Sequence, residues 1–343
     1  MRKLSRRAVL MGAGVISFRV GGWSGAAAAA DSLPLPFSGS TESSLPMMVA
    51  VAKGYAKDHD IDVTRFVASP GANIRANVIG KQFAFAALDW SHVSIARIAG
   101  APLRTVLAIT DRSNQSLLVR STLRNSVKTP TDLKGKTVGV SSPGSSSWTY
   151  AKMALEHVGL HPDRDYNLIV IGGDTGVVTT ALQTGRIDAV SAWEPITSIA
   201  LSRNVAFPLI EAWNLKQQVQ YYGAERLASL ALITRDDVIK AKPDLVKRMV
   251  GTHVAALKFI RANSAEAIVD TVLSNPKSAE IFGGLGKTLF TTIVERAKPA
   301  FGEGCISKQG YELLMKRMVD YKVLPREIPF NDYADTSYVG MCA

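Results

Sequence analysis

The chain alternates short apolar runs with segments in which apolar residues recur at helical spacing. The strand-like runs are Ser32–Phe37, Ile61–Ala68, Gln82–Leu88, Leu103–Thr110, Gln115–Ser121, Lys136–Val140, Tyr166–Ile171 and Arg186–Trp193. The helical segments between them include Leu45–His59, Ala72–Gly80, Ser147–Val158 and Val177–Gln183. This repeated order is typical of an α/β fold, in which mostly parallel sheets are flanked by helices.

The pattern changes to helices from Lys242 onward. Pro243 begins one predicted helix that runs to about Arg261, since proline is well tolerated in a first helical turn. After the first 30 of the 343 residues, 313 remain. This length exceeds one ordinary hydrophobic core and predicts two lobes.

Residues 1–30 have the pattern of a secretory signal peptide. A basic start is followed by the apolar run Ala8–Phe18, which is too short to span a bilayer, and by small residues before Asp31. The paired Arg6 and Arg7 also match a twin-arginine export signal, although paired arginines occur in general secretory signals too. We therefore expect a soluble periplasmic protein, exported by the twin-arginine or the general secretory (Sec) machinery.

The charge of the chain bears on which partners it could bind. The formal net charge of +11 includes five basic residues of the first 30, which contain no acid, so 35 basic residues remain against 29 acidic ones, a net of +6. These charges are scattered rather than clustered in a stripe, which disfavours nucleic acid as a partner.

Cys305 and Cys342 could form a disulfide in an oxidising compartment or remain free thiols.

The loops after the predicted strands carry the candidate chemistry. They are rich in glycine, tryptophan and small hydroxyl residues: Ser38–Ser40, Asp89–Ser91, Ser141–Trp148, Gly172–Thr175 and Trp193–Pro195. Ligands of open α/β sheets collect at the carboxyl ends of the strands, so these loops suit a small polar solute.

Catalytic, cofactor and metal motifs are missing. Ile281 replaces the first glycine of a P-loop before Gly286, and Pro143 replaces the second glycine of a nucleophile elbow.

The stretch Ser145-Ser146-Ser147 lies between a strand and a helix. Serine at a helix start satisfies free backbone N–H groups, and the same groups attract an anion. Gly144 lets the backbone approach a ligand closely. Both a cradle for an anionic group and a simple helix cap remain open.

Four segments resemble one family. Asp132–Val140, the serine loop, Met153–Leu160 and Ala181–Pro195 are similar to the solute-binding proteins of ABC importers for sulfonates, taurine, nitrate and thiamine-precursor pyrimidines. The resemblance implies two α/β lobes joined by two crossing strands, with residues 31–122 and 228–343 in one lobe and 123–227 in the other. It also implies a monomer without catalysis or cofactor, which closes on its solute and delivers it to an ABC permease.

Carried over by position, the family's ligand loops fall on ten candidate residues. They are Ser38, Ser40, Asp89, Trp90, Ser91, Ser145, Ser146, Ser147, Trp193 and Glu194. Asp89 and Glu194 depart from the family, because a carboxylate facing a sulfonate would repel it. Each acid either points away and caps a loop or meets an amine, amidine or ring N–H of the solute.

Other possibilities stay open for the aromatic residues and the function. Trp90, Trp148 and Trp193 either stack on the solute or pack in the core, and Tyr221 and Tyr222 are weaker candidates. Hinge motion is expected near residues 120–130 and 222–230. The alternative functions are a periplasmic enzyme and a sensor module on the same scaffold.

Overall fold

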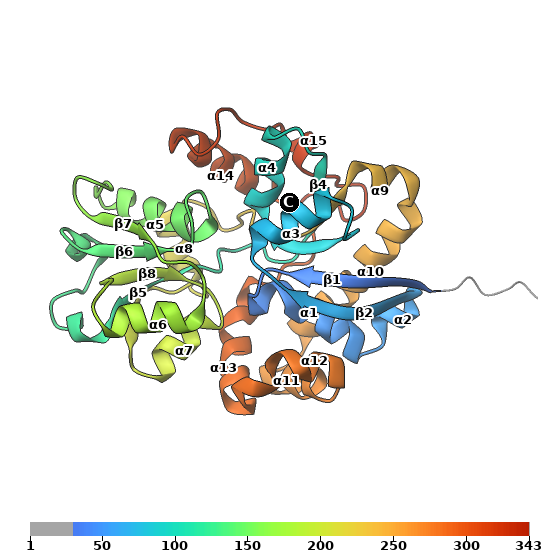
Figure 1. Ribbon diagram of the computed structural model, residues 1–343, viewed down its shortest axis with the longest axis horizontal. Coiled ribbons are helices and arrows are strands. Elements are labelled where there is room, and N and C mark those ends of the chain that lie inside the picture. The colour runs from blue at the N-terminus through green and yellow to red at the C-terminus, as the bar shows by residue number, and fades with distance from the viewer. Residues whose placement is uncertain (1–29, 343) are drawn as a thin grey trace, which may run out of the picture.

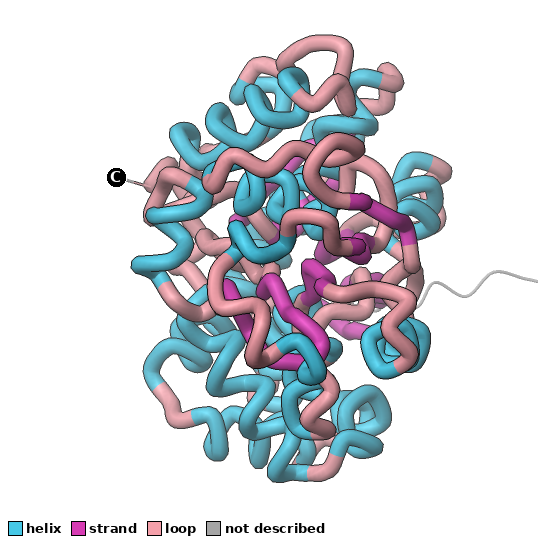
Figure 2. Tube along the Cα trace, turned by 90° about the vertical axis from the view of Figure 1, so that its left-hand side faces the viewer, coloured by secondary structure: helices cyan, strands magenta, loops and turns pink. Residues whose placement is uncertain are grey.

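The computed structural model describes residues 30–342, which form two lobes, each built on a five-stranded sheet (Figure 1). The predicted signal peptide lies outside the described residues except for Ala30. Seen from the side, the strands lie inside and helices and loops cover them (Figure 2). The two-lobed α/β fold predicted from the strand–helix pattern is confirmed.

Lobe 1 contains the first sheet, whose strand order is β2-β1-β3-β10-β4. Its strands are β1 (Asp31–Phe37), β2 (Ile61–Ala68), β3 (Ala86–Asp89), β4 (Leu103–Ala108) and β10 (Leu230–Arg235). The pairs β1–β2 and β1–β3 are parallel, whereas β10 is antiparallel to both β3 and β4. The sheet is therefore mixed.

Lobe 2 contains the second sheet, with the order β7-β6-β8-β5-β9. Its strands are β5 (Ser116–Arg120), β6 (Thr137–Val140), β7 (Asn167–Val170), β8 (Ala189–Ala192) and β9 (Ala206–Ile210). Strand β6 is parallel to β7 and β8, and β5 is antiparallel to β8 and β9. The antiparallel strand is β10 in lobe 1 and β5 in lobe 2. Each of these strands is the first one after the chain crosses from the other lobe.

The helices connect the strands and fill the C-terminal third. They are α1 (Thr41–Ala52), α2 (Tyr55–Asp58), α3 (Gly71–Ile79), α4 (Trp90–Ile98), α5 (Ser146–His157), α6 (Thr175–Gln183), α7 (Ile196–Ser202), α8 (Leu215–Tyr222), α9 (Asp236–Ala241), α10 (Pro243–Ala262), α11 (Ala265–Leu273), α12 (Pro276–Phe282), α13 (Lys287–Ala297), α14 (Lys308–Asp320) and α15 (Phe330–Tyr333). Short 3₁₀ turns are η1 (Ser121–Leu123), η2 (Pro130–Leu133), η3 (Gly283–Leu285) and η4 (Lys298–Ala300).

The predicted helix Leu45–His59 is two helices in the structure. Helix α1 already begins at Thr41, because the Ser40 side chain accepts a hydrogen bond from the Ser43 N–H and caps it. Gly54 adopts a φ of 82°, which favours glycine and separates α1 from α2. Strands β9 and β10 are also absent from the sequence prediction.

Two segments, 109–115 and 223–229, carry the chain between the lobes. They contact each other, since the Leu227 N–H donates to the Asp111 carbonyl oxygen over 2.7 Å. Strand β5 already belongs to the second sheet, so the change of sheet comes before the predicted boundary at residue 122. The hinge motion near residues 120–130 and 222–230 stays a prediction. The first crossing ends where β5 begins, at Ser116.

Helix α14 packs on both lobes. Tyr311 near its start meets Trp90 of lobe 1 edge to face, with ring centroids 6.1 Å apart. Beyond its end, Tyr321 meets Trp148 of lobe 2 in the same way at 5.6 Å. The Thr149 hydroxyl of α5 donates to the Met318 sulfur over 3.3 Å. The C-terminal part of the chain is thus a third contact between the lobes, beside the two crossing segments.

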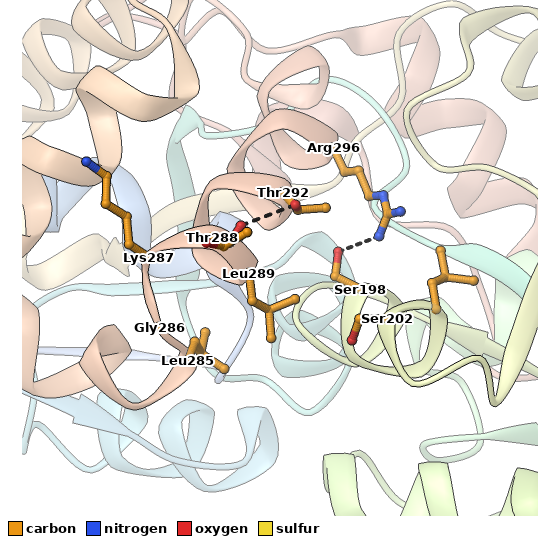
Figure 3. Close-up of a pocket in the computed structure, with 10 residues that line it drawn as sticks. Ser198, Ser202, Leu285, Gly286, Lys287, Thr288, Leu289, Thr292 and Arg296 are labelled. Atoms are coloured by element: carbon orange, nitrogen blue, oxygen red, sulfur yellow. Dashed lines mark hydrogen bonds between the residues drawn. The ribbon is translucent and has the colours of Figure 1, made fainter.

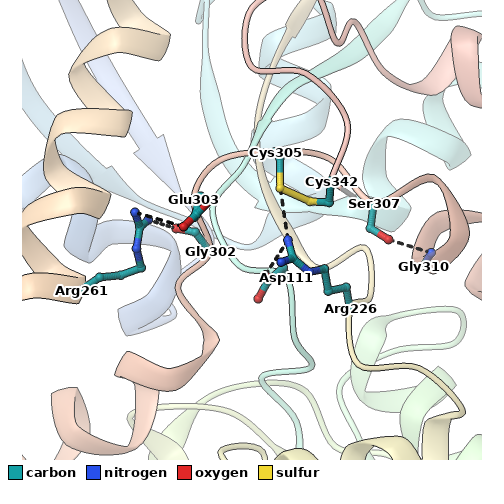
Figure 4. The surroundings of a disulfide bond; sticks show 9 residues. All are labelled: Asp111, Arg226, Arg261, Gly302, Glu303, Cys305, Ser307, Gly310 and Cys342. Carbon is teal, nitrogen blue, oxygen red and sulfur yellow. Dashed lines mark hydrogen bonds and ion pairs between the residues drawn. A yellow bond between two sulfur atoms is a disulfide. The ribbon is translucent and has the colours of Figure 1, made fainter.

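The two cysteines form a disulfide that ties the end of the chain to the segment before α14 (Figure 4). The Cα atoms of Cys305 and Cys342 are 5.0 Å apart. Arg226 lies between this disulfide and Asp111, donating to the Cys305 sulfur over 3.3 Å and pairing with the Asp111 carboxylate at 3.7 Å. The sequence left open whether the two cysteines pair or remain free thiols, and the structure shows that they pair.

Candidate functional site

A cavity of about 810 Å³ lies between the lobes, at the carboxyl ends of their parallel strands. Loops that follow β1, β2 and β3 contribute from lobe 1, and loops that follow β6, β7 and β8 contribute from lobe 2. The lining includes Ser38, Gly39, Ser40, Ser69, Pro70, Gly71, Arg75, Asp89, Ser91, His92, Asn114, Gln115, Ser141–Ser147, Gly172, Gly173, Asp174 and Trp193. Parallel strands end at one edge of a sheet, so two facing sheets bring six such loops together.

The structure gathers eight of the ten predicted residues around this cavity. They are Ser38, Ser40, Asp89, Ser91, Ser145, Ser146, Ser147 and Trp193. Trp90 and Glu194 do not line it. Whether the eight bind a solute stays a prediction, but their convergence means that one ligand could contact both lobes.

Asp89 is the last residue of β3 and the cap of α4. Its Oδ1 accepts hydrogen bonds from the Ser91 N–H at 3.0 Å and from the Ser91 hydroxyl at 2.6 Å. Its Oδ2 accepts a hydrogen bond from the Ser146 hydroxyl of lobe 2. Burial raises the pKa of Asp89, while these donors act in the opposite direction. The carboxylate thus joins the lobes at the edge of the cavity.

The serine loop is a helix cap that also faces the cavity. The Ser145 hydroxyl caps α5 by accepting from the Trp148 N–H over 3.3 Å. The hydroxyls of Ser141, Ser145 and Ser147 form a triangle with O–O distances of 2.9–3.0 Å. Capping and cradling are therefore compatible, because the cap uses one hydroxyl and leaves the loop in the lining.

Trp90 and Glu194 require a correction, because both side chains turn away from the cavity. No loop separates β3 from α4, so Trp90 is the first residue of the helix and packs into the core against Tyr311, 1% exposed. The carboxylate of Glu194 instead accepts from the N–H of Ser198 at 3.1 Å and from its hydroxyl at 2.9 Å. Trp148 is also absent from the lining and packs on Tyr321.

Next to the cavity, with Asn114 in the lining of both places, Glu194 of lobe 2 lies close to Glu42 at the start of α1 in lobe 1. Both line a second, much smaller cavity together with Arg296. Burial raises the pKa of Glu194 to about 7, although hydrogen bonds from Ser198 and the charge of Arg296 oppose this shift. Burial, and then the charge of Glu194, raise the pKa of Glu42 well above its usual range.

A further groove of about 480 Å³ runs between α7 and α13 (Figure 3). Arg296 of α13 reaches across it and donates to the Ser198 hydroxyl over 2.8 Å. Lys287 points away from Ser198 and pairs with Asp270 at 2.6 Å. This groove is a contact between the lobes, with its cation already engaged.

Sequence reasoning missed Arg75 and His92, which line the cavity from α3 and α4. The Arg75 guanidinium lies 3.0 Å from His92 Nδ1. The signal was present, because Ser69-Pro70-Gly71 breaks the chain directly after the strand Ile61–Ala68. That loop stands at a strand end like the others, and α3 begins there.

The two lobes with a cavity between them have the fold of periplasmic binding proteins. A family model described as NMT1/THI5 like matches residues 41–267. The chain belongs to this family, as the resemblance in its sequence implied.

Known proteins agree with this assignment. Proteins of Brucella abortus, Brucella suis and Brucella melitensis that are named as binding proteins are 28% identical over 141 residues. The match spans 41% of this chain and only 41% of the length of each of these curated relatives.

Solved structures show the same fold. The alkanesulfonate-binding protein SsuA of Xanthomonas axonopodis pv. citri, bound to MOPS, has a TM-score of 0.70 at 18% identity, over 90% of this chain and 99% of that one. The nitrate-binding protein NrtA of Synechocystis PCC 6803 has a TM-score of 0.60 at 14% identity, over 72% and 66%. An enzyme, a DszB mutant in complex with biphenyl-2-sulfinic acid, has a TM-score of 0.59 at 14% identity, over 90% and 97%.

Within residues 30–342, no helix combines the length and the apolar character that crossing a bilayer requires.

Proposed function

We propose that this protein is the periplasmic solute-binding component of an ABC importer, which captures a small polar or anionic organic solute and delivers it to a permease. The observation that carries the proposal is the cavity of about 810 Å³ at the strand ends of both lobes. Its lining offers hydroxyls and the N-terminal ends of α3 and α5, which are donors for an anionic or strongly accepting group. Because the chain belongs to the NMT1/THI5-like family, an ABC permease is the partner that we propose.

The alternative function is an enzyme on the same scaffold, because the fold is also similar to that of DszB. Hydrolysis by a serine with a histidine base would need the imidazole in contact with the serine hydroxyl. His92 instead has its Nδ1 engaged by Arg75, and no hydrogen bond joins this imidazole to a serine in the described part of the chain. The arrangement favours binding over catalysis. It is equally compatible with a binding module whose partner is a sensor rather than a permease.

A thermal-shift screen tests the proposal. The panel contains sulfonates, amino-sulfonates, nitrate, aromatic carboxylates and pyrimidines, with neutral sugars as the control set. A ligand at 100 times its dissociation constant adds about 2.7 kcal/mol of stability. Mass spectrometry of the recovered ligand separates the alternatives: an unchanged ligand supports binding alone, and a converted ligand supports the enzyme. No shift with any panel member would contradict the proposal.

The export route is part of the same proposal. The pair Arg6 and Arg7 supports twin-arginine export. If this route is used, the double variant Arg6→Lys/Arg7→Lys accumulates in the cytoplasm, as cell fractionation would show. Undiminished export would leave the general secretory route.

A further inference from the structure

The described lining of the cavity contains one guanidinium and two carboxylates, and the guanidinium forms an ion pair with neither of them. Among the described residues that line it, Arg75 carries the one guanidinium, and no lysine is present. Arg75 is half-buried and makes no ion pair within residues 30–342. Its pKa is lowered by burial alone. Burying a charge without a counter-charge costs free energy, which a bound anion would offset.

The acids in the lining are already engaged elsewhere. Asp89 accepts hydrogen bonds from Ser91 and from Ser146. Asp174 caps α6 by accepting from the Val177 N–H over 2.9 Å. Neither forms an ion pair with Arg75, so the guanidinium remains available to a ligand.

His92 positions this guanidinium without neutralising it. Arg75 donates to Nδ1 over 3.0 Å, so the neutral ring carries its proton on Nε2. Burial, and then the charge of Arg75, lower the pKa of His92 to about 3, which keeps the ring neutral. The ring lies so close to Gly71 that a Cβ there would be 2.4 Å from Nε2. Glycine at the start of α3 is what makes room for this arrangement.

A small inorganic anion would leave most of the cavity empty. Water occupies about 30 Å³ per molecule in the liquid, whereas the cavity measures about 810 Å³. Its lining also contains apolar surface from Pro70, Ile95 and Pro143, and the indole of Trp193. A ligand that fills it needs an apolar or aromatic body of many atoms in addition to its charged group.

We infer that Arg75, held by His92, is the anchor for the acid group of a bulky organic anion, such as an aryl sulfonate or aryl carboxylate, whose body lies along the apolar lining toward Trp193. This inference rests on the proposed function and specifies its substrate class. It assigns the charge selection to α3 of lobe 1, a segment outside the ten residues that the sequence predicted.

Calorimetry with 2-naphthalenesulfonate and its neutral counterpart naphthalene-2-sulfonamide tests the inference on the mature protein. We expect the wild type to bind the sulfonate at least about tenfold more tightly than the sulfonamide, because hydrogen bonds to a charged group are the stronger ones. Arg75→Gln should remove this preference by weakening sulfonate binding about tenfold or more while leaving the sulfonamide unchanged. Taurine and nitrate should compete poorly, since they leave most of the cavity empty.

Arg65→Gln is the matched control, because it removes the same charge from an exposed position on β2 outside the lining. Its affinities should equal those of the wild type. If Arg75→Gln does not fold, Arg75→Lys keeps the charge but loses the planar fork, and a reduced sulfonate preference is then expected.

Three results would overturn the inference: equal binding of sulfonate and sulfonamide by the wild type, an equal loss for both probes in Arg75→Gln, or no binding of the sulfonate. The last result would still leave the proposed function standing if any other solute of the thermal-shift panel binds. The two proposals therefore fail on different observations.

Discussion

Asp89 uses its two carboxylate oxygens for different contacts. Oδ1 caps α4 within lobe 1, and Oδ2 accepts from the Ser146 hydroxyl of lobe 2. The sequence left open whether this acid faces the cavity or caps a loop. The structure shows that it does both, because the strand ends at Asp89 and the helix begins at the next residue, Trp90.

Ser146→Ala should lower the free energy of unfolding by about 1–3 kcal/mol, because it leaves Asp89 Oδ2 without its donor. Urea denaturation of the ligand-free protein measures this change. Ser142→Ala is the matched control, since Ser142 is exposed in the same loop and should change stability by less than about 0.5 kcal/mol. Equal effects of the two substitutions would contradict the contact with Asp89.

At the scale of elements, the segment after α14 supports the serine loop from outside. Gly144 has a φ of 73°, and a Cβ at this position would lie 2.5 Å from Val323 Cγ1. The loop before α5 therefore depends on a residue that lies 179 positions later in the chain. This contact joins the candidate site to the C-terminal helices that pack on both lobes.

Gly144→Ala should cost about 2–4 kcal/mol of stability, one part from the unfavourable φ and the other from the clash with Val323. Adding Val323→Ala should restore the part due to the clash, with a coupling of about 1 kcal/mol or more in a double-mutant cycle. Gly159→Ala separates the two parts, because Gly159 has a φ of 81° but no neighbour within 4 Å. Strictly additive effects at Gly144 and Val323 would contradict the packing described.

At the scale of the whole molecule, the two lobes meet through buried ionisable groups next to the cavity. Glu42, Glu194 and Arg296 come from both lobes and line one small cavity. Burial raises the pKa of both acids, to about 7 for Glu194. An acid whose pKa is raised in the folded state destabilises that state as the pH rises from its ordinary value to the raised one. The lobe contact is therefore expected to weaken between about pH 4.5 and pH 7.

The double variant Glu42→Gln/Glu194→Gln should gain stability relative to the wild type as the pH rises from 5 to 8. Glu194 alone is expected to contribute about 3 kcal/mol of this difference, at about 1.4 kcal/mol per pKa unit up to its pKa of about 7. Glu42 adds to it in the same direction, because its pKa is also raised. Chemical denaturation of both proteins at the two pH values measures it. His92 and His253, whose pKa values are lowered by burial, are common to both proteins and cancel in the difference. Parallel pH profiles would show that these acids do not titrate as described.

Local patterns in the sequence are enough to predict the fold class and most of the loops of the candidate site. Strand-like runs such as Ile61–Ala68 and helix caps such as Ser145 are local features, set by the apolar period and by hydrogen bonds over three or four residues. Once the strands are assigned, the carboxyl ends of parallel neighbours must lie together, so the loops at Ser38 and Asp89 converge within lobe 1. The loop at Trp193 joins them because the two lobes face each other.

The direction in which individual side chains point depends on tertiary packing. Trp90 turns into the core because a helix begins directly after Asp89 and Tyr311 packs on its ring. Arg75 reaches the cavity because Gly71 leaves room for the His92 ring that holds it. Contacts of this kind join residues far apart in the chain, and they depend on packing geometry that neither periodicity nor composition records.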